Sequence, residues 1–278
     1  ESVAEKVKNH QALNDKELEY LCPVAFKSTM TQKEISKLGL SKHYSFVPTS
    51  RVINDLRTLG WNPVDAVQVK ARKKETNGYQ KHMITFENDS YKTEGATEYP
   101  QLLLTNSHDG GNAFTLSAGI FRLVCSNGLV IKTEDYGTSR LVHKGYSFNS
   151  IQKLVNDFVA TIDETLTRIT AMKEVELTKN QQMEFAKLAA LLRFTEKSYN
   201  EDNIADVVDL DDLLSHERKE DAGDGLWEVY NRVQESIVQG SFHYIGGNKK
   251  SRKARPIKNF KQSIDVNKKL SELAFAYV

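Results

Sequence analysis

Apolar residues in the first half of the chain recur first at a helical period and then at a strand period. The first clear element follows Pro48-Thr49-Ser50, whose hydroxyl groups can cap a helix. Gly60 lies at its end and permits the left-handed conformation that closes many helices. The pattern predicts a short amphipathic helix, whose apolar face is formed by Val52, Ile53, Leu56 and Leu59.

Two alternating segments follow this helix. Residues 64–71 and residues 80–86 both alternate apolar and polar side chains, as half-buried strands do. Asn77-Gly78 lies between them, and this dipeptide is the strongest short-range signal of a hairpin turn. We therefore expect a β-hairpin after the helix.

Further strands are predicted beyond the hairpin. Residues 101–105 form a third strand in this interpretation, and residues 113–116 form a fourth. Residues 117–125 are short and apolar, so their pattern leaves helix and strand open. Residues 141–143 are a candidate for one more strand.

The period becomes helical from Ser150. An apolar stripe runs from Ile151 to Met172 over about six turns and predicts one long helix. Shorter stripes predict helices at residues 181–194, 226–239 and 264–277. A highly acidic segment, residues 199–224, is expected to form a loop between them.

This order of elements predicts an α+β protein. We expect an antiparallel sheet with a β-hairpin packed on helices, followed by a mainly helical C-terminal half. The predicted domains are an α+β sheet domain at residues 1–149 and a helical region at residues 150–278, the latter with the acidic loop and a basic C-terminal segment.

The net charge of +1 conceals a strong asymmetry. Residues 236–264 contain no acid, and this stretch should carry a positive local potential. Its basic residues alternate with Phe242, Tyr244 and Phe260, rings that can stack on bases. The basic residues are Lys249, Lys250, Arg252, Lys253, Arg255, Lys258 and Lys261.

A second basic cluster decorates the expected hairpin. It consists of Lys70, Arg72, Lys73, Lys74, Lys81 and His82, together with the ring of Tyr79. Lysines on an exposed hairpin also protect an edge strand against aggregation, and a basic tail also forms an ordinary surface. Two such clusters with aromatic neighbours favour nucleic-acid binding over that explanation.

The absence of known catalytic and metal-binding motifs argues against most catalytic chemistry. The histidines are scattered, no HExxH, CxxC or GxxxxGK[ST] occurs, and we expect no catalytic residue, metal or cofactor. Cys125 lies in an apolar stretch, where a thiol usually stays protonated. Asp65 with Gln68 and Lys70 is similar to a metal-dependent nuclease pattern, but glutamine replaces its second acid.

The remaining composition indicates a cytoplasmic protein. No apolar stretch approaches the roughly 18 residues of a membrane-spanning helix, so no membrane partner is expected. Cys22 and Cys125 are far apart among apolar neighbours, which suits thiols in a reducing cytosol.

Four stretches of the chain carry a family resemblance: VPTSRVINDLRTLGWNPVDAVQVKAR (47–72), LLLTNSHDGGNAFTLSAGIFRLVCSNGLV (102–130), LWEVYNRVQESIVQG (226–240) and a terminal VNKKLSELA (266–274). They resemble an uncharacterised "phage/plasmid-like protein" family of mobile elements. The resemblance covers roughly residues 13–278. It implies a mobile-element context and no established chemistry.

The chain also resembles the Rad fifty-two superfamily of single-strand annealing proteins. Arg51-Val52-Ile53 through Gly60-Trp61 is similar to that superfamily's opening helix, and the hairpin and the helix at residues 150–173 follow in the expected order. The resemblance implies ring-shaped homo-oligomers that hold single-stranded DNA in a basic groove. The corresponding groove residues would be Lys70, Arg72, Lys73, Lys74 and Lys81.

We therefore predict a DNA-binding protein that anneals single strands in recombination, with both basic clusters on one shared surface. The alternatives are an anti-defence protein that binds a host defence or recombination protein or mimics DNA through its acidic segment, and a metal-dependent nuclease. An activity as an enzyme is not expected.

Overall fold

The structure, a computed structural model, describes residues 1–71, 73–92, 98–111, 114–122, 139–141, 146–194, 199–215 and 218–278. The chain forms two compact units, which are described separately below. Unit 1 comprises Glu1–Gly119 and Thr133–Ala160, and unit 2 comprises Ile120–Lys132 and Thr161–Val278. An antiparallel sheet lies in the N-terminal half and helices dominate the C-terminal half, so the predicted α+β class is confirmed.

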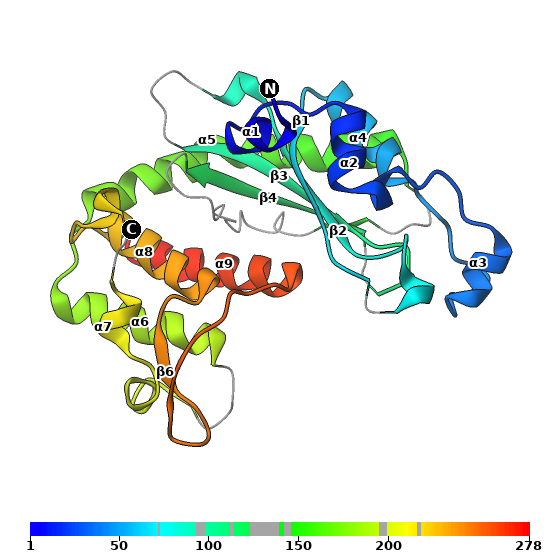
Figure 1. Ribbon diagram of the computed structural model, residues 1–278. Coiled ribbons are helices and arrows are strands. Elements are labelled where there is room, and N and C mark those ends of the chain that lie inside the picture. The colour runs from blue at the N-terminus through cyan, green and yellow to red at the C-terminus, as the bar shows by residue number, and fades with distance from the viewer. Residues whose placement is uncertain are drawn as a thin grey trace. The chain divides into compact units, whose positions relative to one another are not determined.

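Unit 1 is built on a sheet with the strand order β1-β2-β3-β4-β5. The pairs β1/β2, β2/β3 and β4/β5 are antiparallel. Figure 1 shows the first strands side by side, with the first turns of the long helix α5 behind them. The strands are β1 (Asn62–Gln68), β2 (His82–Glu87), β3 (Glu98–Asn106), β4 (Phe114–Arg122) and β5 (Ser139–Leu141).

The predicted hairpin and third strand are confirmed, with different boundaries. Strand β1 ends at Gln68, before residue 71, where the predicted strand ends. Residues 69–81 therefore connect β1 to β2, and this connection contains a short 3-10 helix, η2 (Lys74–Thr76). Gly78 has the positive φ that its turn signal requires. Strand β4 includes residues 117–122 of the segment whose pattern left helix and strand open. Residues 123–125 and 142–143 lie outside the described residues.

The predicted amphipathic helix before Gly60 is confirmed as α4, but its cap differs. The N-cap is Pro48, which offers no side-chain hydrogen bond. The Thr49 hydroxyl instead lies buried 2.8 Å from His82 Nε2. The helical elements of this region are α1 (Val3–Lys8), α2 (Asp15–Leu21), η1 (Pro23–Phe26), α3 (Gln32–Lys37), α4 (Thr49–Thr58) and η3 (Asp89–Tyr91).

The core of unit 1 lies between one face of the sheet and the helices. Apolar residues alternate along β2 and β3 and are buried on that face, while most residues of the opposite face are buried as well. Phe158 of α5 contacts the ring of Trp61, with 5.9 Å between centroids. The buried residues include Ile84, Phe86, Leu102 and Leu104 from the strands, and Val52, Ile53, Leu56, Ile151 and Val155 from the helices.

Two buried polar groups tie other segments to this sheet. Glu87, only 1% exposed, accepts a hydrogen bond from His10 Nδ1 (2.9 Å) and forms an ion pair with Lys92 (2.8 Å), and so holds the N-terminal segment. Burial raises the pKa of Glu87, but hydrogen bonds from His10, Lys92 and Gln101 bring it below its usual value. His82 Nδ1 donates to the Gln80 carbonyl (3.0 Å), so its Nε2 accepts from Thr49.

Unit 2 is helical, as predicted. Helix α8 has the predicted boundaries, and α5, α6 and α9 agree with their predictions within a few residues. Within the described residues, no helix has both the length and the apolarity needed to cross a membrane. The elements are α5 (Phe148–Glu174, shared with unit 1), α6 (Lys179–Arg193), η4 (Ile204–Asp206), α7 (Leu210–Leu213), η5 (Lys219–Asp221), α8 (Leu226–Gln239), β6 (His243–Ile245), β7 (Ser251–Lys253) and α9 (Phe260–Phe275).

The expectation of an acidic loop at residues 199–224 is wrong. This acidic segment forms η4, α7 and η5, and its apolar residues Ile204, Leu210 and Leu213 are buried in the core of unit 2. They pack with Phe185 and Tyr230 from the long helices. The sparse apolar residues among many acids do not form a periodic stripe, so pattern reasoning missed them.

We predict that the His82 network makes stability depend on pH. Burial lowers the pKa of His82 to about 4, so the folded state favours the neutral ring. The contribution of the neutral His82 ring to the free energy of unfolding is complete above the ordinary pKa of 6.5. It is lost as the pH falls from 6.5 to 4. Urea unfolding of wild type should therefore show a loss of stability, up to about 3 kcal/mol, that is absent in His82→Gln. The exposed His43→Gln variant should behave as wild type, and an equal pH dependence in His82→Gln would contradict the prediction.

Candidate nucleic-acid interface

The basic run, residues 249–261, lies at the surface of unit 2. It covers the end of the β6–β7 turn, strand β7, an extended segment and the start of α9. The hairpin projects from the helices of its unit in Figure 1. All seven predicted cations are exposed: Lys249, Lys250, Arg252, Lys253, Arg255, Lys258 and Lys261.

The backbone of the basic run is anchored to the end of α8. The Ala254 amide donates to the Phe242 carbonyl (2.8 Å), and the Ile257 amide donates to the Val238 carbonyl (2.9 Å). Gly240 closes α8 with φ +72°, and a Cβ atom there would lie 2.5 Å from the carbonyl carbon of Arg255. These contacts fix residues 254–257 of the run against the end of α8 and the residues that follow it.

The rings of this region are mostly packed. Phe242 is fully buried, so the expectation that its ring stacks on bases is wrong. Tyr244 is half-buried against Phe194, with 5.2 Å between ring centroids. The side chain of Phe260 lies outside the described part of the chain. The interface therefore depends on charge more than on stacking.

The acidic segment pairs with the other edge of the hairpin. The Ile245 amide donates to the Val207 carbonyl (2.7 Å), and the Asp209 amide donates to the His243 carbonyl (3.0 Å). His243 also contacts Asp212, with 2.7 Å between Nδ1 and Oδ2. Val208 thus forms an isolated antiparallel bridge with Tyr244 of β6, a pairing that the sequence did not predict.

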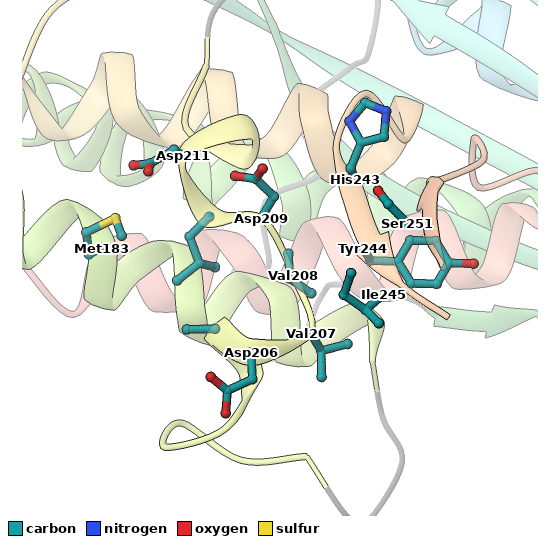
Figure 2. A pocket seen from close by; sticks show the side chains of 12 residues that line it. Met183, Asp206, Val207, Val208, Asp209, Asp211, His243, Tyr244, Ile245 and Ser251 are labelled. Atoms are coloured by element: carbon teal, nitrogen blue, oxygen red, sulfur yellow. The ribbon is translucent and has the colours of Figure 1, made fainter. Parts of the chain in front are cut away.

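A cavity of about 390 Å³ lies between the acidic segment and the hairpin. Figure 2 shows Asp206, Asp209 and Asp211 on the acidic segment, and His243 and Ser251 on the hairpin. In the described part of unit 2, no ion pair joins a carboxylate to a cation of the basic run. Carboxylates therefore border the β6 side, and the cations on the β7 side stay available to an anionic ligand.

The second predicted cluster lies in unit 1, mainly in the connection between β1 and β2. Lys70, Lys73 and Lys74 are exposed, Lys81 is half-buried, and Arg72 lies outside the described residues. The expectation that His82 belongs to this surface cluster is wrong, because its ring is fully buried and hydrogen-bonded to Thr49 and Gln80. Because the two clusters belong to different units, their predicted convergence on one surface stays a prediction.

Tyr79, predicted with that cluster, already has partners within unit 1. Its hydroxyl donates to Glu34 of α3, and the Lys27 ammonium lies 4.6 Å from its ring centroid. Hydrogen bonds, first from Lys27 and then from Thr31 and Tyr79, hold the pKa of Glu34 well below its usual value. Tyr79 therefore helps to attach α3 to the hairpin connection.

Asp65 and Gln68, two residues of the nuclease-like pattern, make structural hydrogen bonds within unit 1. Asp65 accepts a hydrogen bond from the Ala66 amide (2.8 Å), and burial raises the pKa of its carboxyl group. Gln68 accepts from the Val24 amide (3.3 Å) and so holds η1. Among the residues that the structure describes, no cluster of three or more His, Cys, Asp or Glu side chains suits a metal ion. Cys125 and His143 lie outside that range.

Comparisons with known proteins identify relatives of unknown function. A family model described as a domain of unknown function (DUF932) matches residues 39–271. Two proteins of Escherichia coli strain K12 are similar: the UPF0380 protein YafZ is 28% identical over 85% of this chain and 83% of its own, and the UPF0380 protein YfjQ is 29% identical over 72% and 70%. No solved structure matches. Membership of an uncharacterised family is thus confirmed, while the likeness to annealing proteins stays a prediction.

We predict that Gly240→Ala destabilises the protein by about 2 kcal/mol or more. The left-handed conformation alone costs roughly 1–2 kcal/mol in a residue with a Cβ atom, and backbone atoms of Arg255 block the space. Gly247→Ala is the matched control, because this glycine lies in the nearby β6–β7 turn, where a Cβ atom would meet nothing within 4 Å. Urea denaturation measures both, and equal stabilities for the two variants would contradict the prediction.

Proposed function

The chain belongs to this DUF932 family of unknown function, and we propose that it binds single-stranded DNA through the basic run and anneals complementary strands. One observation carries the proposal: seven exposed cations, free of ion pairs in the described structure, on a backbone segment anchored to α8. A pre-ordered segment loses less conformational freedom on binding than a flexible tail does.

The mechanism requires no bond chemistry. Lysine and arginine side chains replace the counterions of the phosphates, and the release of those counterions favours binding at low salt. Contacts to phosphates carry no sequence information and leave the base edges accessible. Two strands neutralised in this way can approach each other and pair.

The wider context of this function is part of the proposal. Annealing requires two strands to be held together, which suits a homo-oligomer, in a ring as the resemblance implies. We place the protein in the cytoplasm and in recombination of mobile elements. The exposed lysines of residues 69–81 are a second contact region for the same strands.

An anti-defence role is the second candidate, and one observation favours it. The acidic segment is folded and displays carboxylates in fixed positions on η4 and α7, including Asp206, Asp209 and Asp211. Fixed carboxylates can replace phosphates in the site of a DNA-binding enzyme. In that case the chain would inhibit such an enzyme without binding DNA.

We predict that removing four charges from the basic run weakens DNA binding and its salt dependence. The variant combines Lys249→Gln, Lys250→Gln, Arg252→Gln and Lys253→Gln. Each phosphate contact to a single strand contributes about 0.7 to the slope of log K against log salt concentration, so the slope should fall by up to about 3. Fluorescence anisotropy of a labelled oligonucleotide between about 50 and 200 mM salt measures it.

The matched control removes four exposed lysines of unit 1: Lys16→Gln, Lys33→Gln, Lys37→Gln and Lys42→Gln. It changes the net charge equally and should bind as wild type does. Equal losses in both variants would mean that only the overall charge matters. A wild type without salt-dependent binding would refute the proposed function.

Annealing is predicted to depend on the same residues. Wild type should accelerate the pairing of two complementary labelled oligonucleotides, followed by energy transfer, and the variant of the basic run should not. The control with four unit 1 lysines replaced should retain the acceleration. Binding without any acceleration would restrict the function to DNA binding.

A further inference from the structure

Arg193, the last residue of α6, connects three parts of unit 2. Its guanidinium group donates from Nη1 to the Ile237 carbonyl in α8 and from Nη2 to the Arg255 carbonyl in the basic run. The same group lies 5.7 Å from the ring centroid of the buried Phe242. One side chain therefore joins the helix that supports the basic run to the run itself.

Arg193 reaches the basic run at Arg255, where two backbone segments are in close contact. Gly240 approaches Arg255 so closely that no side chain fits between them. The amides of Ala254 and Ile257 bind the same end of α8 from either side of Arg255. Arg193 adds a side-chain link to these main-chain contacts, since the two nitrogens of its planar fork donate to separate carbonyls.

Packing by itself would not require a charged side chain at position 193. The side chain is half-buried, and in the described residues no carboxylate lies within ion-pair distance of it. Burial lowers the pKa of Arg193, which means that burial disfavours its charged form. The positive charge of Arg193, kept despite this effect of burial, adds to the positive potential at the surface of the basic run.

We propose that Arg193 is a positioning residue of the nucleic-acid interface: it fixes the backbone of the basic run at Arg255 and so presents the cations in one arrangement. This inference rests on the proposed function for the identity of the ligand. Its structural part, the fixation of the run, does not depend on DNA.

The test compares Arg193→Met and Arg193→Lys with wild type in the full-length chain. Methionine removes the charge and both bridges, whereas lysine keeps the charge but lacks the planar fork. Limited trypsin digestion followed by mass spectrometry gives the rate of cleavage after Lys253 and Lys258. Cleavage after Lys219, an exposed lysine of the same unit, is the internal reference.

In Arg193→Met, cleavage in the run should rise about tenfold relative to the reference, and affinity for a single strand should fall about tenfold per folded molecule. Arg193→Lys should lie between wild type and Arg193→Met. If cleavage rises equally after Lys219, or if affinity stays within about twofold of wild type, the positioning role is refuted.

The two proposals fail in different ways. If wild type binds no DNA, the proposed function is wrong, and the digestion still decides whether Arg193 fixes the run. If wild type binds DNA but the variants leave digestion and affinity unchanged, only the role of Arg193 is wrong.

Discussion

The candidate interface depends on the close backbone contact between the end of α8 and residues 254–257. Gly240 makes this contact possible, since any Cβ atom at its position would overlap the backbone of Arg255. Hydrogen bonds from the backbone amides of Ala254 and Ile257 to the carbonyls of Phe242 and Val238 then fix the direction of the chain on both sides of Arg255. Without this contact the segment between β7 and α9 would be freer to move, and its cations would lose more conformational freedom on binding.

Electrostatics gives the same region two distinct sides. The acidic segment pairs with β6 and brings Asp206, Asp209 and Asp211 to the cavity beside the hairpin, whereas all charged residues of β7 and the following segment are cations. The near-zero net charge of the chain therefore hides a local separation of charge. A phosphate chain would be attracted to the β7 side and repelled on the other, which restricts how it can lie.

Unit 1 uses its buried polar groups to hold segments together. Glu87 receives donors from His10, Lys92 and Gln101, and His82 lies in hydrogen bonds with Thr49 and Gln80. Such groups resemble catalytic dyads in composition, yet His10, Lys92 and Thr49 here join the sheet to neighbouring segments. Satisfied buried networks are costly to disturb and favour one arrangement of the segments.

The sequence by itself determined the elements with strong periods: α4, the strands β1 to β3 and the long helices, because repeated apolar spacing is a local property. It also showed the seven cations of the basic run, since an acid-free stretch is visible without a fold. Only the tertiary structure decided that Phe242 is buried, that the acidic segment folds and pairs with β6, and that Arg193 reaches Arg255. These features join residues far apart in the chain, and their local patterns are too short or too polar to predict the partners.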